Sequence, residues 1–192
     1  MINVIENGTK EGVDYINISA YSETELGKML APGYPVDTQL IIGQIGTVRA
    51  AVSYVITPGY PHHLLGKKKF TRSDVRSIPT RTITVDNYWA IYAYILIERV
   101  RQDQVLRKLL LENTLDFTSY TIRKETLLGE KTSMLKINNS MRGYIDIIKQ
   151  IKGLLVNEKL DDDTRVKDVI LSYAAIDDIS KLFDGSTVSI KA

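Results

Sequence analysis

The chain has 192 residues, of which 44% are hydrophobic and 25% charged, and its formal net charge is +2. This composition is typical of a globular protein and excludes a disordered chain, a collagen-like repeat and a coiled-coil rod. Because cysteine is absent, disulfides and thiolate zinc sites are excluded, and a reducing compartment such as the cytoplasm is favoured. Residues 1–10 are polar and no apolar run reaches about 18 residues, so we expect neither export nor a membrane span.

The first predicted elements are a strand and a short helix. Residues 13–19 mostly alternate between polar and apolar side chains and are rich in β-branched types, which favours a strand. Ser22 and Glu25 have the spacing of a capping box, which predicts a helix that runs to about Leu30. Pro-Gly-Tyr-Pro follows and ends that helix.

A second strand and a second helix are predicted next, before a basic loop. Residues 38–42 favour a strand, and Thr47 is placed to cap a helix over residues 48–56. A second Pro-Gly-Tyr-Pro ends this helix, and residues 62–77 form the basic loop. The alternation over residues 80–85 predicts another strand.

The middle of the chain predicts one long central helix. Asp86 is placed to cap it, and apolar residues recur at helical intervals over residues 87–113. Residues 117–122 favour a strand. Residues 141–155 carry an apolar stripe at helical spacing, which predicts a second long helix that packs on the central one.

The last part of the chain predicts short elements around charged turns. Residues 166–175 are helical or extended, residues 177–183 form a short helix, and residues 186–191 alternate as a terminal strand. The whole pattern predicts an α+β fold. We expect a single compact domain over residues 1–192 with a long central helix, a second long helix and several short strands.

Charge is unevenly placed along the chain. Residues 67–81 hold six basic side chains against one acidic side chain, whereas residues 158–184 hold eight acidic against four basic. A positive and a negative face are therefore expected, and such faces favour contact with a protein partner.

The basic loop supplies most of the candidate phosphate-binding residues. Histidine can hold a phosphate, transfer a proton or take a metal, and lysine and arginine neutralise phosphates of a nucleotide or a nucleic acid. A solvated polar loop is the alternative. The candidates in the loop are His62, His63, Lys67, Lys68, Lys69 and Arg72.

Aromatic residues mark the start of the central helix. The run Tyr88-Trp89-x-x-Tyr92-x-Tyr94 could wall a ligand pocket, with Trp89 as the stacking candidate, or it could fill the core.

Motifs of the common enzyme classes are absent from the sequence. There is no Walker loop, dinucleotide glycine fingerprint, nucleophile elbow or helical zinc motif. The run Asp161-Asp-Asp163 lacks the alternate acids, the glycine and the distant glutamate of a calcium loop. We therefore assign no catalytic residue and expect neither a metal nor a cofactor.

Three segments carry a resemblance to a known family. Glu25-Leu-Gly-Lys-Met-Leu-Ala-Pro32, the helix start Ile45-Gly-Thr-Val48 and the aromatic helix start Asn87-Tyr-Trp-Ala90 resemble small tailed-phage proteins that are distantly similar to the NADAR family. The resemblance covers at most the first 120 residues. It implies a compact α+β domain that acts on N-glycosidic bonds of ADP-ribose-type compounds, located in the host cytoplasm.

The resemblance also places Arg49 at a functional position. The family has a Leu-Ser-Asn-Phe-like motif and a Ser-x-Glu helix start, whereas this chain has Leu30-Ala-Pro32 and Thr47-Val-Arg49. The family's carboxylate thus falls on Arg49, which cannot act as a base or nucleophile. An arginine at a helix start can still hold a phosphate or a carboxylate.

These observations lead to three functional hypotheses. The first is a non-catalytic intracellular accessory protein of phage type that acts through protein contacts. The second is a protein that binds a nucleotide or ADP-ribose-like ligand, or an enzyme of N-glycosidic bonds, using Arg49, the loop residues and Trp89. The third is nucleic-acid binding through the basic loop.

Overall fold

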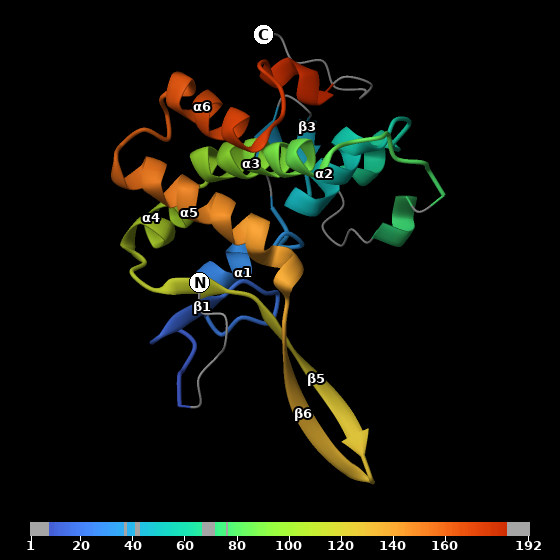
Figure 1. The fold of residues 1–192 in the computed structure, drawn as a ribbon, viewed down its shortest axis with the longest axis vertical. Helices are drawn as coiled ribbons and strands as arrows, with labels where there is room; N and C mark the ends of the chain where they lie inside the picture. The colour runs from blue at the N-terminus through green and yellow to red at the C-terminus, as the bar shows by residue number, and fades with distance from the viewer. Residues whose placement is uncertain (1–7, 37, 41–42, 67–71, 76, 184–192) are drawn as a thin grey trace.

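The helices and strands of the computed structural model confirm an α+β fold (Figure 1). The structure describes residues 8–36, 38–40, 43–66, 72–75 and 77–183. Its α-helices are α1 (Glu25–Leu30), α2 (Val48–Ile56), α3 (Val85–Gln102), α4 (Gln104–Glu112), α5 (Arg142–Val156) and α6 (Asp163–Tyr173). Its strands are β1 (Tyr15–Asn17), β2 (Thr38–Leu40), β3 (Gly43–Ile45), β4 (Asp116–Thr118), β5 (Tyr120–Leu127) and β6 (Glu130–Ile137). Within the described residues the strands pair two by two, β1 with β4 in parallel and β2 with β3 and β5 with β6 antiparallel.

Threonine caps set the start of the first two helices. The Thr47 hydroxyl accepts a hydrogen bond from the Ala50 amide at 3.0 Å, so α2 has the predicted bounds. The predicted capping box at the start of α1 is wrong, although the helix itself is confirmed. Thr24 is the cap and accepts from the Gly27 amide at 3.1 Å, whereas the Ser22 hydroxyl donates to the buried Glu11 carboxylate.

The predicted single helix over residues 87–113 is two helices. Helix α3 begins two residues earlier, after Thr84, whose hydroxyl accepts from the Asn87 amide at 3.2 Å, so Asp86 is not the cap. The break falls at Asp103. Its side chain accepts from the Leu106 amide at 2.9 Å and so caps α4. A capping side chain in the middle of an apolar pattern therefore divides the helix.

The strand predicted over residues 80–85 is also wrong. Residues 79–84 have no regular secondary structure, and α3 begins at Val85. The Arg81 amide donates to the Ile56 carbonyl at 2.9 Å, but no strand lies beside this segment among the described residues. Alternation alone does not make a strand, because a strand needs a neighbour to complete its hydrogen bonds.

An antiparallel hairpin follows β4 where the sequence predicted one short strand and then a helical pattern. Strands β5 and β6 project away from the helices (Figure 1). At the tip, Leu128 and Gly129 both have positive φ, 53° and 83°. Ile122 and Leu135 face each other in the register and are 63% and 43% exposed, so this part of the hairpin lies outside the core.

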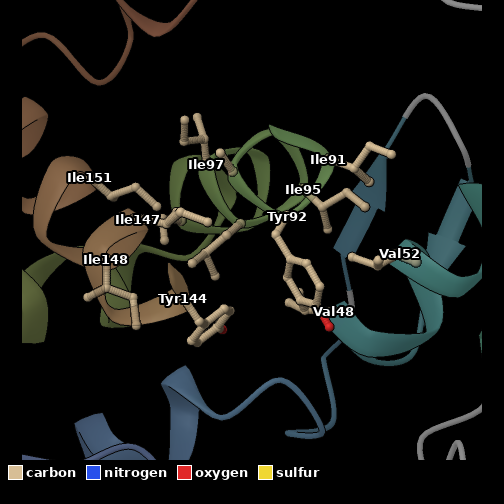
Figure 2. Packing of buried hydrophobic residues seen from close by; sticks show 14 of the residues in the cluster. Val48, Val52, Ile91, Tyr92, Ile95, Ile97, Tyr144, Ile147, Ile148 and Ile151 are labelled. Atoms are coloured by element: carbon tan, nitrogen blue, oxygen red, sulfur yellow. The ribbon is translucent and has the colours of Figure 1, made fainter. Parts of the chain in front are cut away.

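The core is built around α3. Helices α2 and α5 pack on it, as Figure 2 shows for Val48 and Val52 from α2 and for Ile147 and Ile151 from α5. The prediction that the second long helix packs on the central one is confirmed. Within the described part of the chain, no helix is long and apolar enough to cross a membrane.

The C-terminal part is helical where it is described. Helix α6 occupies the segment predicted as helical or extended, and a 3₁₀ helix at Ile179–Phe183 occupies part of the predicted short helix. The terminal strand predicted over residues 186–191 lies outside the described residues.

Two ion pairs connect the start of α6 to the central helices. The Asp161 carboxylate pairs with Arg107 at 2.8 Å, and the Asp163 carboxylate pairs with Arg101 at 2.9 Å.

Candidate ligand-binding pocket

A large pocket lies between α2, the segment before α3 and the start of α3. We call it the Arg49 pocket; its volume is about 880 Å³, which is within the range of small-molecule sites. It is lined by Arg49, Val52, Ser53, Ile56, Thr57, Val75, Ile78, Pro79, Thr80, Tyr88 and Tyr92. The lining therefore combines an arginine, hydroxyl groups, apolar side chains and two tyrosines.

A smaller hollow adjoins this pocket and shares part of its wall. We call it the Trp89 hollow; its volume is about 240 Å³. It is lined by Pro32, Arg49, Tyr88, Trp89, Tyr92, Ser140, Met141 and Tyr144. Arg49, Tyr88 and Tyr92 line both spaces, so a ligand bound at Arg49 can extend into either of them.

The start of α2 holds Arg49 at this shared wall. The Arg49 amide donates to the Pro32 carbonyl at 3.0 Å, and its exposed side chain lies against Gly33. A Cβ atom added at Gly33 would lie 3.4 Å from one terminal nitrogen of the Arg49 guanidinium. Arg49 therefore packs closely on the turn after α1 and still faces solvent. Among the described lining residues of both spaces, it alone carries a full charge at neutral pH.

Aromatic rings of α3 form the remainder of the shared wall. The ring of Tyr88 is 5.5 Å from that of Trp89 and 5.2 Å from that of Tyr92, centroid to centroid. Tyr92 reaches toward Val48 of α2 in Figure 2, and its ring meets the Tyr144 ring edge to face at 5.8 Å. A Cβ atom at Gly143 would lie 2.6 Å from the Trp89 indole, so glycine allows α5 to approach this ring.

The two buried tyrosines at the wall stay protonated at physiological pH. Burial raises the pKa of Tyr92, and the neighbouring Tyr88 raises it further, whereas Arg49 acts in the opposite direction. Burial likewise raises the pKa of Tyr144, against the effects of Arg99 and Arg49. The wall thus supplies neutral aromatic rings beside one guanidinium.

The structure brings together two of the predicted ligand residues, Arg49 and Trp89. His63 is exposed in the 3₁₀ helix at His62–Leu64 and does not line either space. The backbone of Arg72 lies in the 3₁₀ helix at Arg72–Val75, whose last residue, Val75, does line the Arg49 pocket. Lys67, Lys68 and Lys69 lie outside the described residues, as do the side chains of His62 and Arg72.

Sequence reasoning missed several polar lining residues. Arg49 and Ser53 lie four residues apart and therefore on one face of α2, a spacing that was available in the sequence, and Thr57 directly follows the end of this helix. Thr80 lies in the segment that was predicted as a strand.

The aromatic run at the start of α3 divides between the pocket wall and the interior. Tyr88, Trp89 and Tyr92 line a pocket, whereas Tyr94 packs on Phe183 with ring centroids 5.2 Å apart. Ligand binding by the first three rings stays a prediction, whereas Tyr94 packs in the protein interior.

No family model, curated protein or solved structure matches the chain. The resemblance to tailed-phage proteins and the NADAR family therefore stays a prediction. In the described part of the chain, no three His, Cys, Asp or Glu side chains are grouped so as to hold a metal ion.

Proposed function

We propose that the chain binds a small anionic ligand with an aromatic part, such as a nucleotide, in the Arg49 pocket and the Trp89 hollow. The observation that carries this proposal is the position of Arg49 in the wall that both spaces share. A guanidinium binds phosphate or carboxylate oxygens through paired hydrogen bonds. The neighbouring rings offer faces on which a base can stack.

The remaining lining supports the same class of ligand. Ser53, Thr57 and Thr80 bring hydroxyl groups to the Arg49 pocket, and hydroxyl groups bind the polar parts of a sugar or a similar group. Val52, Ile56 and Ile78 add apolar surface. Sites for small ligands combine such apolar walls with a few polar groups that fix orientation.

A comparison of AMP with adenosine tests the role of Arg49. We expect AMP to bind more tightly than adenosine, because a hydrogen bond to a charged group contributes about 1.5–3 kcal/mol. Arg49→Ala should weaken AMP binding about 10- to 100-fold and leave adenosine binding nearly unchanged. Isothermal titration calorimetry measures both affinities, after a thermal-shift screen of AMP, ADP, NAD and ADP-ribose.

The control is Arg165→Ala. Arg165 is an exposed arginine of α6 that does not line either space, so the variant has the same charge change and should keep the preference for AMP. The proposal is wrong if no compound of the screen raises the melting temperature. A ligand at 100 times its dissociation constant adds about 2.7 kcal/mol to stability, which such a screen detects.

An accessory role through protein contacts is our second proposal, and the β5–β6 hairpin favours it. Two paired strands alone are only marginally stable in water, and within the described part of the chain no third strand pairs with either edge of this hairpin. Ile122, Leu128 and Leu135 place exposed apolar side chains on this hairpin. Because a second copy of the chain presents the same edges, self-association through the hairpin is the contact that we propose.

Sedimentation velocity over a range of concentrations tests this second proposal. Ile122→Ser combined with Leu135→Ser should shift a dimer to a monomer, because it removes the exposed apolar pair. Val156→Ser, at a side chain of α5 that is 59% exposed, is the control and should leave the dimer intact. A wild-type chain that stays monomeric at every concentration would exclude self-association.

A further inference from the structure

Two buried side chains hold the end of α1 from two different helices. One terminal nitrogen of Arg99, in α3, donates a hydrogen bond to the Met29 carbonyl. The Tyr144 hydroxyl, in α5, donates to the Leu30 carbonyl at 2.6 Å. The last carbonyls of a helix have no partner within the helix, so these two bonds complete the end of α1. They also fix where the next turn begins.

That turn forms the wall behind the Arg49 guanidinium. Pro32 lines the Trp89 hollow, and its carbonyl accepts the hydrogen bond from the Arg49 amide. Gly33 lies against the Arg49 guanidinium. Three hydrogen bonds thus link the end of α1 and the turn after it to α3, α5 and α2, and the last of them is donated by the proposed ligand-binding residue.

Arg99 is an unusual residue for a core. Its side chain is completely buried, and among the described residues its Nε and second terminal nitrogen have no hydrogen-bond partner and no carboxylate forms an ion pair with it. Its guanidinium carbon lies 5.6 Å from the centre of the Tyr34 ring, on the turn that follows Gly33. A buried charge with unsatisfied donors destabilises a fold, so replacement by an apolar side chain of similar length should not reduce stability.

We propose that Arg99 and Tyr144 are positioning residues for the ligand site: they fix the Pro32–Gly33 turn and so hold the Arg49 guanidinium in place. This inference rests on the proposed ligand binding at Arg49. Electrostatics agrees with the geometry, because Arg49 and Arg99 both act on the Tyr144 hydroxyl and both lower its pKa against the larger effect of burial. The Tyr144 side chain also lines the Trp89 hollow together with Arg49.

Two variants test the inference by two independent measurements. In Arg99→Met, we expect AMP to bind about tenfold more weakly while the melting temperature is unchanged or higher. In Tyr144→Phe, which removes only a hydroxyl group, we expect a similar loss of affinity. In both variants the amides of Arg49 and Tyr34, which donate to the Pro32 and Ala31 carbonyls, should exchange with solvent at least tenfold faster.

Matched controls come from the same helices or from the same kind of bond. Arg101→Met removes an arginine of α3 that donates to the Leu160 carbonyl, and Tyr173→Phe removes a hydroxyl group that donates to Asp146 at 2.6 Å. Neither control should change AMP affinity or the exchange of the Arg49 amide.

The two measurements distinguish failure of the proposed function from failure of the positioning role. If the wild-type chain binds no ligand of the screen, the proposed function is wrong, but amide exchange still tests whether Arg99 and Tyr144 position the turn. Unchanged exchange at Arg49 in both Arg99→Met and Tyr144→Phe would overturn the inference.

Discussion

The chain is expected to unfold between pH 10 and pH 12. Burial raises the pKa of Tyr92 and Tyr144 well above the ordinary value of about 10, and it raises the pKa of Tyr94 to about 12. These side chains stay neutral in the folded state while they ionise in the unfolded state. Their contribution to stability is therefore complete below pH 10 and is lost as the pH rises through the folded-state pKa values.

The size of this effect follows from proton linkage. Each such tyrosine lowers the free energy of unfolding by about 1.4 kcal/mol per pH unit above pH 10, and three together lower it by about 4 kcal/mol. Two pH units then remove about 8 kcal/mol, which is comparable to the whole stability of a typical domain, about 5–15 kcal/mol. Urea unfolding at a series of pH values measures the slope.

Removal of one of these tyrosines provides the internal comparison. Tyr94→Phe should reduce the slope by about 1.4 kcal/mol per pH unit, since one ionising group is lost from the unfolded state. Tyr21→Phe, at a side chain that is 87% exposed, is the matched control. A free energy of unfolding that stays constant from pH 10 to pH 12 would contradict the burial of these hydroxyl groups.

Helix positions were predictable where the signals were local. The bounds of α2 agreed because Thr47 caps its first turn and Pro58 follows shortly after its end, and both residues act within a few positions of the helix terminus. The break at Asp103 could not be read from apolar periodicity, because the periodicity continues from α3 into α4. The break depends on one side chain that caps α4.

The hairpin was missed because its own signals are weak. A two-residue turn with positive φ at both positions is most often Asn-Gly or Asp-Gly, whereas here it is Leu128-Gly129. The described side chains Ile122 and Leu135 face solvent, so burial imposes no alternation of polar and apolar residues there. The parallel pairing of β1 with β4 joins segments about a hundred residues apart, and no local pattern in the sequence indicates it.

The candidate site was predictable in part. Arg49 followed from the family resemblance and Trp89 from the aromatic run, and the structure places both at the Trp89 hollow. The turn at Pro32 and the segment at Thr80 come to the site through tertiary contacts, which a pattern of residue types does not encode. The sequence did not single out Arg99, because its burial depends on how distant segments such as α1 pack against α3.

Gly27→Ala is expected to destabilise the chain by about 3 kcal/mol, the largest effect that we expect from the loss of a single glycine. Gly27 is buried in α1, and a Cβ atom there would overlap the Asn17 carbonyl oxygen and the Ser22 hydroxyl. The Asn17 oxygen belongs to the backbone of β1 and cannot rotate away. Chemical denaturation of the variant measures the loss.

Gly153→Ala is the control that separates this clash from the general effect of glycine in a helix. A Cβ atom at Gly153, in α5, would meet no atom within 4 Å. Alanine favours a helix over glycine by about 1 kcal/mol, so this variant should be as stable as the wild type or more stable. If Gly27→Ala behaved in the same way, α1 would not pack on β1 as described.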